Sequence, residues 1–278
     1  MKYYQRDGMV EIVGVSDFDL ERIFECGQCF RWNADENGVY TGIAFGIAAR
    51  IFRDGDSIFI SGTIDDFESV WLDYFDLNRD YSAIRQGLCI DDFMMEATTQ
   101  GAGIRILRQE KWEALCSFII SQCNNIPRIK SIISTLCREF GSAVMLDGET
   151  YYSFPSAQTV AELDVHALAP LRCGYRAQYI ITAAKAVASG ELNLDAISLI
   201  SPLEAKATLK KLHGVGDKVA DCVLLFGLNM LDAFPVDVWM KRAMAEHFEA
   251  GFDYRVFSPY AGVAQQYIFH YVRNVRGV

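Results

Sequence analysis

Leu212-His-Gly-Val-Gly-Asp-Lys218 and, farther along, Phe234-Pro-Val-Asp237-Val-Trp239 decide the predicted fold of the second half of this chain. Apolar residues recur at helical spacing over 203–212 and 218–226, so we expect two helices joined by a tight turn. The glycines of the turn leave main-chain N–H groups bare at the start of the second helix, and such a terminus suits a phosphate. An ordinary corner between two helices is the plainer interpretation of the same turn.

Lys218 and Asp237 are the candidate catalytic residues. Each is expected in or beside the first turn of a helix near the phosphate-holding turn, which suits an amine nucleophile with a carboxylate partner. A solvent-exposed helix lysine and an aspartate that only caps its helix are the alternative interpretations. The presence of both residues favours the catalytic interpretation.

The first part of the chain has the pattern of short antiparallel strands. Turn sequences at 35–38 and 53–56 separate β-branched and aromatic runs, as in hairpins. The expected strands cover residues 9–15, 29–32, 39–44, 47–52 and 57–60. From about residue 65 the apolar spacing becomes helical, with Pro127 expected in the first turn of one helix and Gly141 at its end.

This order of elements predicts an α+β fold. We expect an antiparallel β-sheet domain with flanking helices over residues 1–100, followed by an all-α domain over residues 101–278. The 278 residues include 51% hydrophobic and 22% charged residues, which is enough to form a buried core. No apolar run reaches membrane-spanning length and no leader pattern is evident, so we expect a soluble, cytoplasmic protein.

The charge is divided unevenly along the chain. Residues 1–100 hold 8 Lys+Arg against 19 Asp+Glu, net −11, and residues 101–278 hold 18 against 17, net +1, which together make −10. An acidic total opposes non-specific binding to nucleic acid, because Lys and Arg supply most of that affinity. Any prediction of DNA binding must therefore rest on local geometry.

The eight cysteines are expected to be free thiols. Cys26 and Cys29 have the spacing of a zinc or redox pair, but a second pair and a histidine pair at ligand spacing are missing. No cysteine follows Cys222, so a C-terminal cluster of four cysteines that could hold iron and sulfur is missing from the sequence. We therefore expect no cofactor.

Several stretches resemble one family. Residues 212–222 with Pro235-Val-Asp237 resemble the helix-hairpin-helix DNA glycosylase signature, and Gly-Val-Gly-Asp-Lys-Val-Ala-Asp-Cys over 214–222 is closer still to the two-domain 8-oxoguanine DNA glycosylase/AP lyases. The other matching stretches are Gly27-Gln-Cys-Phe-Arg-Trp32, Ser117-Phe-Ile to Asn124-Asn-Ile-Pro-Arg128, Gly174-Tyr-Arg-Ala177, and Ala261-Gly-Val-Ala-Gln265 with Phe269. The resemblance covers about residues 10 to 275.

The resemblance implies a fold and an activity. The sheet domain would be TATA-binding-protein-like and the second domain an all-α helix-hairpin-helix glycosylase domain. The enzyme would flip 8-oxoguanine out of duplex DNA. Lys218 would attack C1′, hold the sugar as a Schiff base and nick the strand by β-elimination, while Asp237 would stabilise the cationic sugar. Damaged duplex DNA would be the partner of a monomer that needs no other protein and no membrane.

The resemblance also implies how the base is bound. Cys222 and Phe269 would sandwich the extruded purine, and Gln265 would hydrogen-bond its Watson–Crick edge. The main-chain carbonyl of Gly27 would accept from N7–H, a proton that 8-oxoguanine has and guanine lacks. For Cys222 or Phe269 alone, ordinary core packing is the simpler explanation.

The implied DNA contacts fall into three groups. The wedge and opposite-base group comprises Cys123, Asn124, Arg128, Tyr175 and Arg176, and the phosphate group comprises Gly214, Val215 and Gly216. The main-chain carbonyls of Lys210, Leu212 and Val215 form a candidate cation site. Three residues depart from the family pattern: Cys123 replaces an Asn, Trp239 a phosphate-binding His and His213 a Pro.

Three alternatives compete with this interpretation. Alkyl-purine glycosylases of the superfamily generally lack the lysine, so Lys218 weighs against them. Oxidised-pyrimidine glycosylases usually carry iron–sulfur cysteines, which are missing here. A non-catalytic DNA-binding protein would keep the hairpin alone, and the retention of Lys218 with Asp237 weighs against it.

Overall fold

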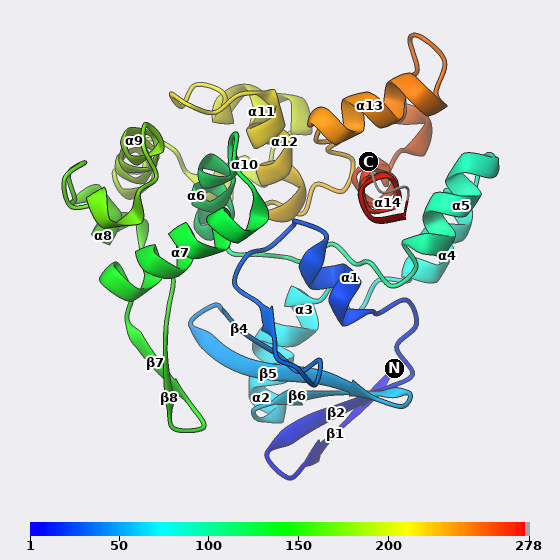
Figure 1. Ribbon diagram of the computed structural model, residues 1–278, viewed down its shortest axis with the longest axis horizontal. Coiled ribbons are helices and arrows are strands. Elements are labelled where there is room, and N and C mark those ends of the chain that lie inside the picture. The colour runs from blue at the N-terminus through cyan, green and yellow to red at the C-terminus, as the bar shows by residue number, and fades with distance from the viewer. Residues whose placement is uncertain (276–278) are drawn as a thin grey trace.

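A six-stranded antiparallel sheet forms the lower lobe of the molecule (Figure 1). The coordinates are a computed structural model that describes residues 1–275. The strand order is β1-β2-β6-β5-β4-β3. The strands are β1 (Lys2–Arg6), β2 (Met9–Val13), β3 (Asn33–Ala34), β4 (Tyr40–Ala44), β5 (Ile47–Asp54) and β6 (Ser57–Ser61). Four of the five expected strands are therefore present with small shifts of their ends.

The prediction for residues 29–32 is wrong, because this stretch is a loop that leads into β3. The side chains of Cys29 and Trp32 in this loop pack in the core of the sheet lobe, which explains why the stretch is apolar although it is not a strand. β1 was not predicted, since its exposed residues lack an apolar alternation. It pairs along its whole length with β2.

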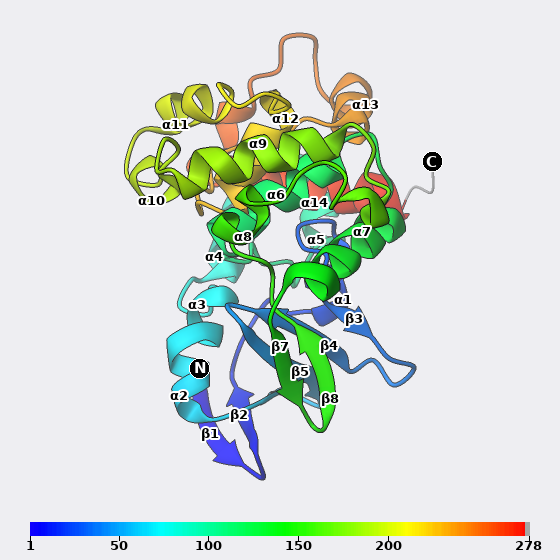
Figure 2. The same ribbon diagram turned by 90° about the vertical axis from the view of Figure 1, so that its left-hand side faces the viewer.

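A second, two-stranded sheet joins the lobes. β7 (Ala143–Leu146) and β8 (Glu149–Tyr152) form a hairpin that descends from the helices and lies beside β5 in both views (Figures 1 and 2). The sequence analysis missed it, although Asp147 and Gly148 form a typical hairpin turn with positive φ angles of 51° and 84°. Arg50 and Asp147 link β5 to this hairpin by an ion pair of 3.0 Å.

Helices form the upper lobe. They are α4 (Tyr81–Gly87), α5 (Asp92–Gln100), α6 (Lys111–Ser121), α7 (Ile126–Phe140), α8 (Ala157–Ala161), α9 (Arg176–Ala188), α10 (Leu194–Ile197), α11 (Pro202–Leu209), α12 (Asp217–Phe226), α13 (Val238–His247) and α14 (Ala261–His270). Pro127 lies in the first turn of α7 and Gly141 caps its end, as predicted. The α+β class is thereby confirmed. No helix among residues 1–275 is long and apolar enough to cross a membrane.

The two hydrophobic cores divide the chain. One lies against the sheet, where α1 (Leu20–Glu25), α2 (Ile64–Asp66) and α3 (Leu72–Tyr74) contribute. The other holds the helices and includes Tyr81, Met94 and Ile104. The segment from α4 to residue 106 thus packs with the helical lobe. The domain limits 1–100 and 101–278 stay a prediction, and residues 276–278 lie outside the described residues.

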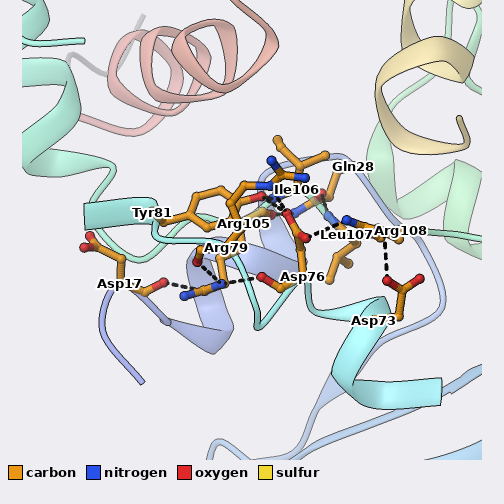
Figure 3. Close-up of polar contacts among 10 residues, drawn as sticks. All are labelled: Asp17, Gln28, Asp73, Asp76, Arg79, Tyr81, Arg105, Ile106, Leu107 and Arg108. Carbon is orange, nitrogen blue, oxygen red and sulfur yellow. Dashed lines mark hydrogen bonds and ion pairs between the residues drawn. The ribbon is translucent and has the colours of Figure 1, made fainter. Parts of the chain in front are cut away.

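A buried arginine joins the lobes (Figure 3). Arg105 is 2% exposed and donates to the main-chain carbonyls of Ser16 at 2.9 Å, Asp17 at 2.8 Å and Asp76 at 2.8 Å. Its guanidinium also lies 4.6 Å from the centre of the Tyr81 ring. Because a buried guanidinium is costly unless its donors are satisfied, this arrangement ties the linker between the lobes to one position.

The Asp76 carboxylate completes this network. It accepts from the Tyr81 hydroxyl at 3.1 Å and forms ion pairs with Arg79 and, at 3.0 Å, with Arg108. The Tyr81 hydroxyl accepts in turn from the main-chain N–H of Ile106 at 3.0 Å. Asp76 has a positive φ of 49°, a conformation that aspartate tolerates better than most residues.

Close packing in the sheet lobe leads to a stability prediction. Trp32 stacks on Phe24 with ring centres 4.5 Å apart and donates to the Tyr74 hydroxyl at 2.8 Å. A Cβ atom added at Gly42 in β4 would overlap the Trp32 indole. We expect Gly42→Ala to lower the free energy of unfolding by about 1–3 kcal/mol through overpacking.

Urea denaturation would measure this loss, with Gly87→Ala as the control. Gly87, the last residue of α4, has open space at its Cβ position and a φ outside the left-handed region, so its replacement adds a methyl group without overlap. An equal loss in both variants would contradict the overpacking explanation.

Candidate active site

Two helix starts place Lys218 and Asp237. Lys218 lies in the first turn of α12, which begins after Gly216. Asp237 is the N-cap of α13, where its Oδ1 accepts from the main-chain N–H of Met240 at 2.9 Å. The capping role that the sequence left open is therefore present. This capping contact involves one of the two carboxylate oxygens of Asp237.

α6 supplies the surroundings of the lysine. The Lys218 Nζ atom lies 3.2 Å from Ser121 Oγ and 5.3 Å from the centre of the Phe118 ring. Phe118 stacks on Phe226 at 5.3 Å, so an apolar wall lies beside the amine. Sequence reasoning missed Ser121 and Phe118 as site residues, although both lie inside the matching stretch 117–128.

One cavity brings the predicted catalytic and base-binding residues together. Its lining consists of Cys26, Gly27, Phe118, Lys218, Cys222, Phe226, Pro235, Asp237, Gln265, Gln266 and Phe269. These residues come from the loop after α1 and from α6, α12, the start of α13 and α14. All six residues predicted for catalysis and base binding are present in this set. Their individual roles stay predictions.

The Cys222 thiol is buried and uncharged near neutral pH. The side chain is 3% exposed, and burial is the main cause that raises its pKa to about 11. Cys26 is 2% exposed and burial raises its pKa to about 12. Burial also raises the pKa of Cys29. These thiols therefore act as small apolar groups near neutral pH. All eight cysteines are unbridged.

A second glutamine accompanies Gln265. Gln266 Nε2 donates to Gln265 Oε1 at 2.7 Å, and both side chains are at least 96% buried. Gln265 Oε1 keeps a second lone pair and Nε2 has two N–H donors, so this amide can both accept from and donate to a bound base. The sequence analysis did not single out Gln266, and the polar pair in an otherwise apolar helix was the available signal.

A larger groove opens beside this cavity. It has a volume of about 530 Å³ and shares Lys218, Asp237 and Phe269 with the cavity. Its outer wall includes Cys123, Asn124, Asn125, Val238 and Trp239. The groove thus leads from the surface to the amine, as access by an extruded nucleotide requires.

The wedge residues differ in exposure. Cys123 is exposed and has a positive φ of 48°, and Asn124 donates to the Ile120 carbonyl at 3.3 Å. Tyr175 is 54% exposed. Arg128 is exposed and donates to the Arg172 carbonyl at 3.2 Å.

Arg176 is buried in the structure. It is only 7% exposed, and its guanidinium donates to the carbonyls of Gln122 at 2.9 Å and Cys123 at 3.2 Å. The same group lies 4.6 Å over the Tyr175 ring. Arg176 thus holds the loop that carries Cys123, and its contact with the opposite base stays a prediction.

The turn 212–216 is closed by the main-chain bond from Val215 N–H to the Leu212 carbonyl at 3.1 Å. Gly214 has a φ of +89°, and a Cβ there would overlap the Tyr179 ring. Gly216 caps α12 without a side-chain hydrogen bond, so main-chain N–H groups are open to a phosphate. The cation site at Lys210, Leu212 and Val215 stays a prediction. The Leu212 carbonyl can serve it, since an oxygen has two lone pairs.

Comparison with known proteins identifies the family. A model described as the 8-oxoguanine DNA glycosylase N-terminal domain matches residues 12–115, and one described as the HhH-GPD superfamily of base excision DNA repair proteins matches residues 116–252. The N-glycosylase/DNA lyase of Saccharomyces cerevisiae is 32% identical over 263 residues, covering 85% of this chain and 70% of the yeast protein. The chain belongs to the 8-oxoguanine DNA glycosylase family.

Solved structures agree with this assignment. The 8-oxoguanine glycosylase/lyase of Clostridium acetobutylicum, bound to double-stranded DNA with cytosine opposite 8-oxoguanine, is 36% identical with a TM-score of 0.93, covering 99% of each chain. The protein named MBOgg1, in complex with a low-affinity DNA ligand, is 42% identical with a TM-score of 0.94, covering 99% of this chain and 100% of that one. The chain is thus a bifunctional 8-oxoguanine DNA glycosylase with AP lyase activity, and it binds damaged duplex DNA.

Ser121 provides a test of the amine's surroundings. We expect Ser121→Ala to lower the single-turnover rate of 8-oxoguanine excision by about tenfold, because the hydroxyl that orients the Lys218 amine is lost. Ser117→Ala, one turn earlier on α6, is the matched control and should retain the rate. Equal rates for Ser121→Ala and the unmodified enzyme would contradict the orienting role.

Proposed function

We propose that Lys218 is the nucleophile of this 8-oxoguanine glycosylase and that Asp237 is its carboxylate partner. The neutral Nζ amine attacks C1′, the C1′–N9 bond breaks and the base leaves with its electron pair and a proton. The sugar ring then opens: the C1′–O4′ bond breaks, O4′ keeps its electron pair and takes up a proton, and C1′ becomes doubly bonded to nitrogen as a Schiff base. This Schiff base loses a proton from C2′, and cleavage of the 3′ C–O bond nicks the strand. The observation that carries this proposal is the single cavity that contains both residues and the predicted base-binding groups.

The cavity has groups for each part of the reaction. Ser121 lies within hydrogen-bond distance of the amine, and Phe118 and Phe226 form an apolar wall beside it. The Asp237 carboxylate offers negative charge to the cationic sugar while it caps α13. Since Lys218 and Asp237 lie at the starts of helices whose next turns are anchored by the buried residues Val219 and Met240, little reorganisation is needed when the substrate arrives.

We further propose that the Gly27 carbonyl distinguishes the lesion from guanine. Gly27 has a φ of +82°, a conformation that favours glycine, and its Cβ position lies 3.9 Å from the Phe269 ring. The carbonyl would accept from N7–H of 8-oxoguanine. In guanine the same carbonyl would face the N7 lone pair, which leaves a buried acceptor unsatisfied.

DNA binding by this acidic protein rests on local groups. The open N–H groups at Gly216 suit a phosphate, and the Arg242 guanidinium lies 5.4 Å over the Trp239 ring beside the groove. We propose that Arg242 supplies a phosphate contact where the family's histidine is replaced by Trp239. The monomeric state and the independence from protein partners also stay proposals.

Replacement of the nucleophile tests the mechanism. We expect Lys218→Gln to lose at least about 10³-fold in excision of 8-oxoguanine, and to give no covalent DNA adduct on borohydride reduction. The measurement is single-turnover cleavage of a duplex with one 8-oxoguanine, with trapping alongside. An adduct in the variant would show that another amine is the nucleophile. If the unmodified enzyme excises 8-oxoguanine opposite none of the four bases, 8-oxoguanine is not its substrate.

Arg128 provides a test of opposite-base recognition. We expect Arg128→Ala to reduce the preference for cytosine over adenine opposite the lesion by about tenfold, because a guanidinium can donate to the acceptor edge of cytosine. Arg138→Ala, at the other end of α7, is the control and should keep the preference. The measurement is the ratio of excision rates opposite the two bases, and an unchanged ratio for Arg128→Ala would exclude this role.

A further inference from the structure

We propose that Gln28 and Gln109 form a clamp that positions the Gly27 carbonyl and thereby controls excision of the damaged base. This inference rests on the proposed role of Gly27 in lesion recognition. Gln28 follows Gly27 in the chain, and Gln109 lies in the linker between α5 and α6. Neither side chain is in contact with the base cavity, so both are positioning residues.

Both polar atoms of the Gln28 side-chain amide form hydrogen bonds. The side chain is 0% exposed, and Nε2 donates to the carbonyl of Ile23 at 2.9 Å and to that of Arg105 at 2.8 Å. Its Oε1 accepts from the main-chain N–H of Leu107 at 2.9 Å. Gln28 thus joins the end of α1 to the linker that carries Arg105 (Figure 3).

Gln109 anchors the main chain of the same residue. It is 8% exposed, and its Nε2 donates to the Gln28 carbonyl at 2.7 Å. The main-chain N–H of Gln109 donates to the carbonyl of Phe226 at 3.2 Å. Phe226 is the last residue of α12, the helix that also carries Lys218. A short chain of hydrogen bonds therefore connects the Gly27 loop to the catalytic helix.

The clamp restrains a flexible position, because Gly27 is a glycine whose φ lies in the left-handed region. A glycine can occupy many backbone conformations, so its carbonyl direction must be set by its neighbours. The peptide plane that carries the Gly27 carbonyl ends at the N–H of Gln28. Fixing both the side chain and the carbonyl of Gln28 leaves this plane little freedom to rotate away from a base in the cavity.

The test compares two reactions of the same enzyme. Excision of 8-oxoguanine needs the base cavity, whereas cleavage of a preformed abasic site needs Lys218 but no base. For Gln109→Met, which keeps the volume and removes the donor, we expect excision to fall by roughly ten- to a hundredfold. Cleavage of the abasic duplex should stay within about twofold, because α12 and Lys218 are retained.

Tyr81→Phe is the matched control. It also removes buried hydrogen bonds of the linker, to Asp76 and Ile106, but on the side away from Gly27. We expect both of its rates to stay within about twofold of those of the unmodified enzyme. Thermal unfolding of both variants shows whether their loss of stability is comparable.

A second variant keeps the proposal testable if Gln109→Met does not fold. Gln28→Glu retains the acceptor for Leu107 and loses the two donated bonds, and we expect the same selective loss of excision. Parallel falls in both reactions, or no fall in excision, would overturn the clamp. Failure of the unmodified enzyme to excise 8-oxoguanine while it cleaves abasic sites would instead reject the proposed substrate.

Discussion

The buried guanidinium of Arg105 is the interaction on which the relation between the two lobes depends. Its donors are taken by main-chain carbonyls of the segments around residues 17 and 76, and its face lies on Tyr81. Removal of such a group would leave several buried carbonyls without partners, a larger cost than the loss of one surface ion pair. The position of the linker that carries Arg105 is consequently fixed relative to both lobes.

This fixed arrangement of the two lobes forms the active site. The cavity takes Gly27 from the loop after α1, Lys218 and Cys222 from α12, and Gln265 from α14. None of these elements forms a base pocket alone, so the pocket exists only where the sheet lobe and the helical lobe are held together. The carbonyl proposed to read the lesion and the amine proposed to attack C1′ therefore come from different lobes of the same chain.

Acidic composition and DNA binding are compatible in this architecture. The excess of negative charge belongs to residues 1–100, most of which form the sheet lobe, whereas the groove is lined mainly by the helical lobe. Around the hairpin turn, Asp217 pairs with Lys210 at 2.8 Å, which limits its repulsion of a phosphate. Helix N–H groups, an exposed Tyr175 and single arginines can then provide contacts without a broad basic surface.

The sequence by itself determined the α+β class, most strands, the helices around the hairpin turn, and the pairing of Lys218 with Asp237, because periodicity and short motifs are local properties. Tertiary structure alone decided that residues 29–32 form a loop, that Arg176 is buried, that Ser121 contacts the Lys218 amine and that Gln109 contacts the Gln28 carbonyl. The hydrogen-bond partners of Arg176, Gln109 and Ser121 in these contacts lie 53 to 97 residues away along the chain. Such contacts depend on how the lobes pack, a property that no local pattern of residues contains.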